Sequence, residues 1–398
     1  MRLLFATTAG TGHFHPLVPV ARACVQAGHD VRVAAPQSFA EAVARTGLDH
    51  APFADAAPEA MRQAFGDIDR LSFEEANARV VRDVFGRLDA QAALPGLIRL
   101  IDEWQPDIVV RETCEFGSLA AAERARVPHA QVAIGMAELA RWAESLAAEP
   151  LAELGALAGL NGSRLMAAQR AEPLFTTVPL SLDPPARADP QPSDEGRIHR
   201  FRDATAVAGT GRLPPPWGDP QLPLVYVTFG TVAARFAASA QLFRRTLDAL
   251  ADLPIRVLLT TGESGDPESL QPWPDNAHVE RWWPQGDALA HAEGMVGHGG
   301  FGTTMGALAA GVPQVVVPLQ AADQRLNAER VASARAGIDL EGGPDGIRFL
   351  GDAVRVLLQD EQYGHGARAV ATEIAALPDA GAMVRVLADL AAERHTPS

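Results

Sequence analysis

The chain has 398 residues, of which 47% are hydrophobic, and a formal net charge of −15. This length favours two domains, with three as the alternative, and is sufficient to bury substantial cores. The acidic balance argues against a general nucleic-acid binder, which needs a basic surface. All 34 basic residues are arginine, and the absence of lysine excludes Schiff-base chemistry, a lysine general base and a P-loop lysine.

Cys24 and Cys114 are the only cysteines in the sequence. Two cysteines in a chain of this length form no disulfide framework, and they lack the spacing of metal ligands. The apolar run at the N-terminus is too short for a signal peptide, and no later stretch is long enough to cross a bilayer. The expected location is therefore the cytoplasm.

The first half of the chain shows the alternation typical of a parallel α/β sheet. An apolar strand is expected at residues 3–6, and a small, glycine-bearing turn follows at 7–12. A helix and a strand at 31–34 complete a β-α-β unit. A further strand is expected at 108–110, with a helix at 118–126 after it.

Prolines and glycines cluster between residues 180 and 223, where we place the domain boundary. We predict an N-terminal domain over 1–205, a Pro/Gly-rich linker over 206–222 and a C-terminal domain over 223–375, where the α/β rhythm restarts. The fold class is α/β: two Rossmann-like, doubly wound parallel-sheet domains facing a cleft. Ligands of such sheets bind at the carboxyl ends of the strands.

The turn after the first strand carries a histidine. Gly10 and Gly12 permit a tight turn, but the third glycine of a dinucleotide-binding fingerprint is absent. His13 could cap the following helix or act as a general base near neutral pH, and within this glycine turn we favour the base. His15 is interpreted as structural or as part of an acceptor wall.

A histidine base needs an acid that orients it and stabilises its cation. Glu112 and Glu115 both follow the predicted strand at 108–110. The alternative is that one or both are solvated carboxylates or pair with Arg111. We favour Glu112 as the partner of His13 because it is nearest to the strand end.

The richest motif spans residues 296–304, between a predicted strand and a predicted helix. Its small residues expose backbone N–H groups at a helix N-terminus, which is an anion site, and His298, Thr303 and Thr304 add donors. With no lysine and no aspartate pair nearby, this favours phosphate binding without a metal over a simple tight turn. Thr231, after the first strand of this half, offers a second donor loop.

Two further patterns flank this motif. Trp282 and Trp283 could stack on a nucleobase or belong to the core. Asp323 and Gln324 can together grip adjacent sugar hydroxyls, although Asp323 could equally cap a helix. Asn327 lies one helical turn further on and could help to hold phosphate.

The order of these motifs resembles that of the inverting glycosyltransferases of the GT-B fold, and more closely the actinobacterial enzymes that glycosylate natural products such as polyketide antibiotics. The resemblance is strongest over residues 282–327. It implies that His13 deprotonates an acceptor hydroxyl, with Glu112 in the place of the family's aspartate partner. It also implies that a C-terminal helix over 376–398 packs back on the N-terminal domain.

The resemblance further implies which residues bind the two substrates. The nucleotide-sugar donor would be bound by Gly12, Thr231, Trp282, Trp283, Gln285, His298, Gly299, Gly300, Gly302, Thr303, Asp323, Gln324 and Asn327. The acceptor, a hydrophobic small-molecule aglycone, would contact Phe14, His15 and Glu115. No cofactor is expected besides the nucleotide sugar as co-substrate, and no metal is expected to be required.

Gly306 stands where relatives that use UDP-sugars often carry a glutamate that binds both ribose hydroxyls. Because 2′-deoxyribose lacks one of these hydroxyls, we expect a dTDP-sugar donor carrying a deoxysugar, and transfer with inversion in a single displacement. The alternatives are a GT-B-like nucleotide-sugar epimerase and a non-catalytic nucleotide-sugar-binding protein. The sugar, the aglycone and the oligomeric state stay open, and a homodimer is one of the states considered.

Overall fold

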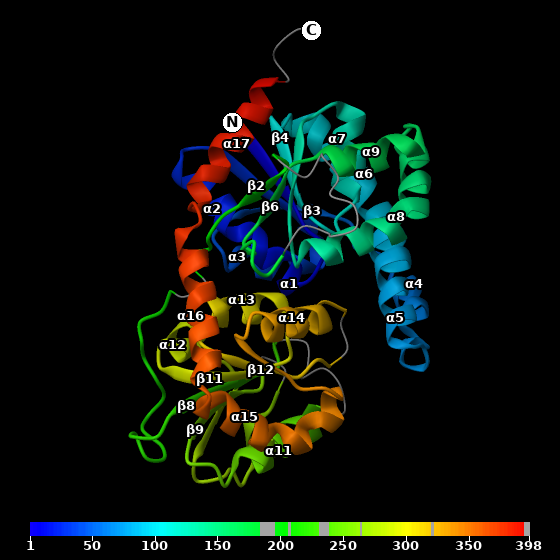
Figure 1. Cartoon of the computed structure of the whole chain (residues 1–398). Helices are drawn as coiled ribbons and strands as arrows, with labels where there is room; N and C mark the ends of the chain where they lie inside the picture. The colour runs from blue at the N-terminus through cyan, green and yellow to red at the C-terminus, as the bar shows by residue number, and fades with distance from the viewer. Residues whose placement is uncertain (184–195, 206–207, 231–238, 263–264, 320–321, 394–398) are drawn as a thin grey trace. The chain divides into compact units, whose positions relative to one another are not determined.

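The computed structural model describes residues 1–183, 196–205, 208–230, 239–262, 265–319 and 322–393, which form two compact units (Figure 1). Unit 1 comprises Met1–Thr177 with the described parts of Pro185–Asp203 and Pro378–Ser398. Unit 2 comprises the described parts of Val178–Pro184 and Ala204–Leu377. Each unit has a parallel sheet covered by helices, which confirms the predicted α/β class with two doubly wound domains.

The sheet of unit 1 has seven parallel strands in the order β3-β2-β1-β4-β5-β6-β7. This order reverses direction between β1 and β4, and the reversal is the topological switch point at which open α/β sheets bind ligands. The strands are β1 (Arg2–Ala6), β2 (Asp30–Pro36), β3 (Asp49–Phe53), β4 (Ile108–Glu112), β5 (His129–Val132), β6 (Leu174–Thr176) and β7 (Ile198–Arg200).

Helices cover both faces of this sheet (Figure 1). A ten-residue π-helix, Val80–Asp89, interrupts the α-helical series. The α-helices are α1 (Thr11–Phe14), α2 (Val18–Gln26), α3 (Ala40–Ala44), α4 (Pro58–Phe65), α5 (Phe73–Arg79), α6 (Ala90–Trp104), α7 (Gly117–Ala125), α8 (Ala137–Leu157), α9 (Gly162–Ala171) and α17 (Ala380–Glu393).

Strand periodicity divides the core of unit 1 between the two faces. Leu3 and Phe5 on β1 pack with residues of α2 and α17, whereas Leu4 and Ala6 pack with residues of α6 and α7. Successive side chains of a strand point to opposite faces, so the apolar residues 3–6 of β1 supply both cores. The polar residues that follow β1 and β4 therefore begin at the carboxyl edge of the sheet.

The sheet of unit 2 repeats the same plan with six parallel strands in the order β10-β9-β8-β11-β12-β13. Its switch point lies between β8 and β11. The strands are β8 (Leu224–Thr228), β9 (Arg256–Thr260), β10 (Ala277–Glu280), β11 (Ala292–Gly297), β12 (Gln314–Val316) and β13 (Gly337–Asp339). The helices are α11 (Ser239–Leu250), α12 (Gln285–Leu289), α13 (Phe301–Ala309), α14 (Ala322–Ser333), α15 (Leu350–Gln359) and α16 (Glu361–Ala376).

Part of the Pro/Gly-rich stretch packs on unit 2. The carboxylate of Asp287 on α12 accepts hydrogen bonds from the backbone N–H groups of Thr210 and Gly211. His291 and Trp283 bond in turn to the carbonyls of Gly211 and Arg212. These bonds fix the backbone of residues 210–212 beside the helix that follows the tryptophan pair. No helix in the part of the chain that the structure describes is long and apolar enough to span a membrane.

Candidate active site

The turn after β1 places His13 at the switch point of unit 1. Thr7 and Thr8 remain buried where the strand ends, and the chain then turns at Gly10, whose φ is 156°. A Cβ added at Gly10 would lie 3.3 Å from Cδ2 of His13, so the glycine leaves room for the imidazole ring. α1 begins at Thr11 and carries His13 within its single turn.

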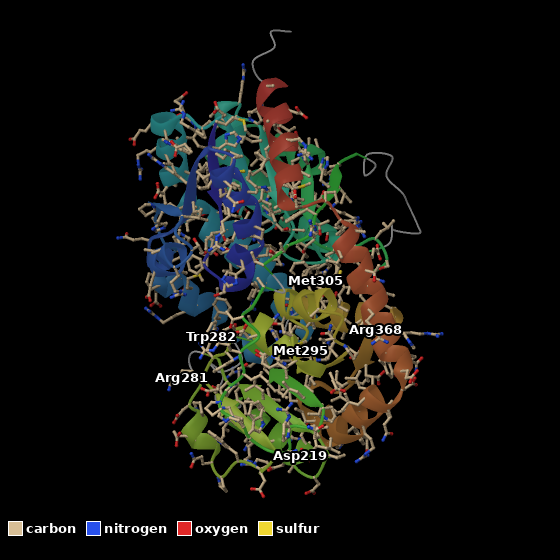
Figure 2. The ribbon with its side chains drawn as sticks, turned by 90° about the vertical axis from the view of Figure 1, so that its left-hand side faces the viewer. Asp219, Arg281, Trp282, Met295, Met305 and Arg368 are labelled. Atoms are coloured by element: carbon tan, nitrogen blue, oxygen red, sulfur yellow. The ribbon has the colours of Figure 1, made fainter. Side chains whose placement is uncertain are left out.

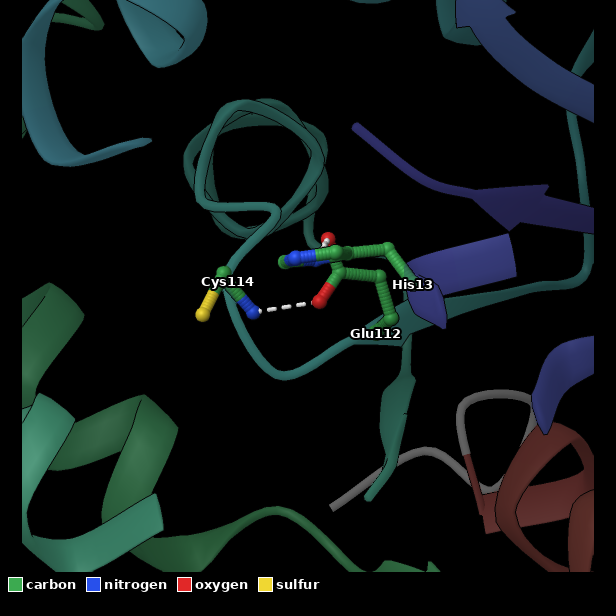
Figure 3. A group of neighbouring side chains, drawn as sticks. All are labelled: His13, Glu112 and Cys114. Carbon is green, nitrogen blue, oxygen red and sulfur yellow. Dashed lines mark hydrogen bonds and ion pairs between the residues drawn. The ribbon is translucent and has the colours of Figure 1, made fainter. Parts of the chain in front are cut away.

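Glu112, the last residue of β4, lies against this histidine. Its Oε1 is 3.0 Å from Nδ1 of His13 (Figure 3). The side chain of Glu112 is completely buried, whereas that of His13 is 21% exposed. The pair therefore combines a carboxylate shielded from water with an imidazole that a ligand can reach.

Three hydrogen-bond donors besides His13 hold the carboxylate of Glu112. The hydroxyl of Thr8 donates to Oε1 at 3.0 Å and its backbone N–H at 3.4 Å, and the backbone N–H of Cys114 donates to Oε2 at 2.6 Å. Burial alone would raise the pKa of Glu112, but the charge and hydrogen bond of His13 and the bonds from Cys114 and Thr8 lower it below its usual value. Glu112 is thus a carboxylate at neutral pH, and Nδ1 of His13 is the donor in their hydrogen bond.

Glu115, the other candidate partner, makes different bonds. Both of its oxygens accept the backbone N–H of Ser118, in the first turn of α7, at 3.1 and 2.9 Å. Burial raises the pKa of Glu115 to about 7 against the opposing bonds from Ser118 and the charge of Arg111. The structure therefore joins Glu112, and not Glu115, to His13.

Two expected acceptor residues, Phe14 and His15, follow His13 directly and differ in their exposure to solvent. The ring of Phe14 is 1% exposed and packs edge-on against Phe39 in the hydrophobic core, which leaves an acceptor little of the ring to contact. His15 is exposed, and Gly12 is exposed with open space where a Cβ would be.

One alternative from the sequence was an ion pair between Arg111 and Glu112 or Glu115. The structure shows a different partner for Arg111. It is completely buried, forms an ion pair with Glu172, and donates from one nitrogen to the carbonyls of Glu112, Thr113 and Glu115 at 3.1–3.2 Å. The guanidinium therefore bonds to three backbone carbonyls at the end of β4 and in the loop that follows it.

Glu172, the ion-pair partner of Arg111, also pairs with His129, which in turn contacts the partly exposed Glu123. His129 lies between Glu172 and Glu123, with its Nδ1 2.8 Å from the first carboxylate and its Nε2 3.1 Å from the second. Burial lowers the pKa of His129, but the hydrogen bonds and charges of Glu123 and Glu172 dominate and raise it to about 9. His129 is therefore an imidazolium at neutral pH.

This raised pKa predicts a pH-dependent stability. The folded pKa of about 9 lies above the unfolded value of 6.5, so the contribution of His129 is full below pH 6.5 and is lost as the pH rises through 9. We expect the free energy of unfolding to fall by on the order of 3 kcal/mol over that window, measured by denaturant titration. The His129→Gln variant should lack this component, and an identical pH profile for both proteins would contradict the assignment.

One group of residues has the composition of a metal site. Within the described ranges, ligand atoms of His13, Glu112 and Cys114 lie within 4.8 Å of one another (Figure 3). Both oxygens of Glu112 already accept hydrogen bonds, and burial raises the pKa of the Cys114 thiol well above its usual value. A protonated thiol is a poor metal ligand, so this donor set suits proton transfer better than metal binding.

Sequence reasoning missed two neighbours of His13. The ring of Phe85, on the π-helix, lies 4.9 Å from the imidazole at 54° to it. Thr8 could have been found as a polar residue directly after a buried strand. No pattern in the sequence places Phe85 near His13, because it lies about seventy residues further along the chain in a stretch with no motif.

The loop between β11 and α13 is the counterpart site in unit 2. His298 and Gly299 follow the strand, Gly300 caps α13, and the exposed Gly302 and half-buried Thr303 lie in its first turn. A Cβ at Gly300 would overlap Nε2 of His298, and one at Gly230 would lie 2.7 Å from its Cε1. Small residues at both positions therefore keep the loops after β8 and β11 close around His298.

His298 is neutral in this loop. Burial lowers its pKa to about 4, and its Nδ1 has no hydrogen-bond partner among the described residues. It can therefore give a ligand a neutral hydrogen bond but no positive charge. Thr231, expected beside it, lies outside the described residues.

The residues expected to hold the sugar and phosphate lie around the start of α14. Asn327 is completely buried and donates to the carbonyl of Gly299 at 2.7 Å, so it supports the loop from behind. The amide oxygen of Gln324 accepts the N–H of Leu319 at 2.7 Å. Asp323 is half-buried in the first turn of the helix.

The tryptophan pair divides into one exposed and one packed ring. Trp282 is 60% exposed, and Figure 2 shows it with Arg281 at the surface of unit 2, whereas Met295 lies in the core. Trp283 packs against the core and donates to the carbonyl of Arg212 at 3.0 Å. Gln285, at the start of α12, is half-buried, and its amide occupies the space that a side chain at Gly306 would need.

Solved structures share this architecture. The glycosyltransferase SnogD from Streptomyces nogalater is 26% identical, with a TM-score of 0.75 over 98% of this chain and 99% of its own. The glycosyltransferase VinC in complex with dTDP is 22% identical, with a TM-score of 0.77 over 99% of this chain and 100% of its own. The two doubly wound units thus form the GT-B fold of glycosyltransferases.

Family models agree with this class. The N-terminal domain of the erythromycin biosynthesis protein CIII-like family matches residues 22–156, and its C-terminal domain matches 244–390. The L-demethylnoviosyl transferase of Streptomyces niveus is 32% identical over 98% of each chain. The chain belongs to this EryCIII-like family of actinobacterial antibiotic glycosyltransferases, which confirms the resemblance predicted from the sequence. It is therefore an enzyme that transfers a sugar from a nucleotide sugar.

Proposed function

We propose that this enzyme transfers a deoxysugar from a dTDP-sugar to a hydroxyl group of a hydrophobic natural-product aglycone, with inversion at the anomeric carbon and without a required metal. The observation that carries the proposal is the 3.0 Å contact between Nδ1 of His13 and the buried carboxylate of Glu112. It holds the imidazole in the tautomer whose Nε2 is basic, and it stabilises the cation that forms.

In the proposed displacement, Nε2 of His13 takes the proton of the acceptor hydroxyl while the oxygen attacks the anomeric carbon. The bond from that carbon to the diphosphate breaks, and the leaving diphosphate keeps the electron pair. Backbone N–H groups at the start of α13 and the neutral His298 would bind the developing charge. Since the carbon is attacked from the face opposite the leaving group, its configuration inverts.

The expected choice of nucleotide rests on Gln285 and Gly306. A side chain at Gly306 would overlap Nε2 of Gln285, so the position from which a glutamate would reach both ribose hydroxyls is filled by a neutral amide. The loss of that carboxylate costs a ribose two strong hydrogen bonds but costs a 2′-deoxyribose only one. The solved complex of the similar enzyme VinC contains dTDP, which is consistent with this choice.

The proposal predicts turnover with a dTDP-sugar that exceeds turnover with the matched UDP-sugar by roughly tenfold or more in kcat/KM. Both donors carrying the same sugar should be incubated with a panel of hydrophobic hydroxylated aglycones, with and without EDTA. The product's anomeric configuration should be opposite to that of the donor, and EDTA should leave the rate unchanged. Conversion of the donor without an acceptor would indicate an epimerase, and binding without product a non-catalytic protein. A strong UDP preference would overturn the choice of nucleotide alone.

A further inference from the structure

The hydroxyl group of Thr8 takes no direct part in the proposed displacement, although it contacts the carboxylate on which that displacement depends. It donates to Oε1 of Glu112 at 3.0 Å, and both side chains are buried. Nδ1 of His13 contacts the same oxygen, also at 3.0 Å. One oxygen atom of the carboxylate therefore binds both the proposed base and a neutral hydroxyl donor.

The sheet places Thr8 beside this oxygen. β1 and β4 are neighbouring parallel strands, and Ala6 on the first is paired with Arg111 on the second. Thr8 and Glu112 follow this pair by two residues and by one residue, so both lie at the carboxyl edge of the sheet, at its switch point. The hydroxyl of Thr7 donates to the carbonyl of Thr8 at 3.0 Å, which helps to fix the backbone there.

The two oxygens of Glu112 have different partners. Oε1 accepts the hydroxyl of Thr8, its N–H at 3.4 Å and Nδ1 of His13, whereas Oε2 accepts the N–H of Cys114 at 2.6 Å. A glutamate has one more rotatable bond than the aspartate that the resemblance places here, so more conformational freedom is lost when it is fixed. With donors from Thr8 and Cys114 on its two oxygens, the carboxylate is held independently of the imidazole.

Thr8 also acts on the charge of the His13–Glu112 pair. Burial raises the pKa of Glu112, and the hydroxyl of Thr8 is one of the interactions that lower it. The pair carries one negative charge when it can act as a base, and it is neutral after it takes up a proton. A donor that stabilises the charged form lowers the pH at which the pair is protonated, whichever residue holds the proton. Thr8 therefore extends the working range of the base towards lower pH.

We propose that Thr8 is a positioning residue for sugar transfer: its hydroxyl orients the carboxylate of Glu112 and, through it, the imidazole of His13. This inference rests on the proposed function, because it requires His13 to be the base. Thr8 is 3% exposed and offers the substrates little surface to contact, so its loss should impair the chemical step and not substrate binding. The alternative is a threonine that only satisfies its own hydroxyl group after a strand.

The test is the pH profile of kcat and kcat/KM for Thr8→Val, which replaces the hydroxyl by a methyl group of similar size. The plateau of kcat should fall roughly tenfold, because the charged carboxylate loses one of its donors, while the KM of each substrate stays unchanged. The acid limb of kcat/KM should move to higher pH. Thr8→Ser retains the hydroxyl and should restore both the plateau and the acid limb.

Thr7→Val is the matched control. Thr7 is also buried, but its hydroxyl donates to a backbone carbonyl and not to Glu112. This control should keep the wild-type pH profile, even where both valine variants unfold at a lower temperature than the wild type. Thr8→Ala and Thr8→Ser form a second pair that differs only in the hydroxyl, and it gives the same comparison if Thr8→Val does not fold.

A double variant shows whether Thr8 acts through Glu112. In the Glu112→Gln background the hydroxyl has no charged group to orient, so the addition of Thr8→Val should lower kcat by less than about twofold. A further tenfold loss in this background would show that Thr8 affects the reaction by another route, and it would overturn the inference.

The remaining outcomes separate this inference from the proposed function. An acid limb that does not move in Thr8→Val, or the same change in Thr7→Val, would make Thr8 a structural residue and overturn this inference alone. Equal losses in Thr8→Ser and Thr8→Val would do the same, because they would assign no effect to the hydroxyl. Activity of His13→Ala near the wild-type rate would instead remove the base that both proposals require.

Discussion

The Glu112→Gln variant is expected to transfer sugar roughly 10²–10⁴-fold more slowly than the wild type, and His13→Ala to lose a similar factor. Glutamine keeps the size of Glu112, but it has no charge to stabilise an imidazolium, and its NH₂ group would face the N–H of Cys114 or the donors at Oε1. The His13 tautomer is then no longer fixed. The measurement is kcat and KM for both substrates.

Two controls distinguish lost catalysis from lost structure. Donor affinity, measured by calorimetry, should be unchanged in both variants, because the proposed donor loop belongs to unit 2. Glu103→Gln alters an exposed residue of α6 and should retain full activity. The double variant should be no slower than His13→Ala alone, since the two residues act as one unit. Turnover near the wild-type rate in His13→Ala would remove this histidine from the role of base.

The Arg111→Met variant is expected to lose about 3–5 kcal/mol of stability in unit 1, because it leaves the completely buried carboxylate of Glu172 without its guanidinium partner. Burial would raise the pKa of Glu172, whereas the charge of Arg111 and the hydrogen bond from His129 lower it. Removing Arg111 therefore takes away one of the interactions that keep the pKa of Glu172 low. Denaturant unfolding and hydrogen exchange in β4 would measure the loss.

The same variant should also reduce activity in any fraction that remains folded. Arg111 holds the carbonyls of Glu112, Thr113 and Glu115, so its loss loosens the loop whose Cys114 N–H binds the Glu112 carboxylate. Arg124→Met removes an exposed arginine of α7 and should change stability by less than about 0.5 kcal/mol. A loss of similar size in both variants would show that the buried ion pair is not the cause.

Much of the fold was predictable because its strands are short apolar runs that end in glycine turns. β1 and β4 were expected to within two residues, and the repeated β-α-β pattern indicated two doubly wound sheets. β3 and β6 left weaker patterns: Asp49–Phe53 contains a histidine and a proline, and Leu174–Thr176 is only three residues long. Their pairing depends on neighbouring strands and not on their own composition.

The site was predictable as far as the carboxyl edge of each sheet, but not in its bonds. Glu112 ends β4 and Glu115 lies three residues further on, so both are near the strand end in sequence, and only the backbone path shows that one meets His13 and the other Ser118. The apolar spacing within 80–89 fits an ordinary α-helix as well as a π-helix. Which residues of that helix face His13 is therefore decided by packing.

Gly86 lets the π-helix pack closely against a second helix. A Cβ at Gly86 would come within 2.8 Å of Cβ of Pro150, in the middle of α8. The π-helix thus packs closely at Gly86 against the side chain of Pro150 in α8. Substitutions along α8 would therefore shift the π-helix and the Phe85 ring that packs on His13, while the His13–Glu112 pair itself stays the same. The surroundings of the proposed base can in this way change without any change in the base or its carboxylate.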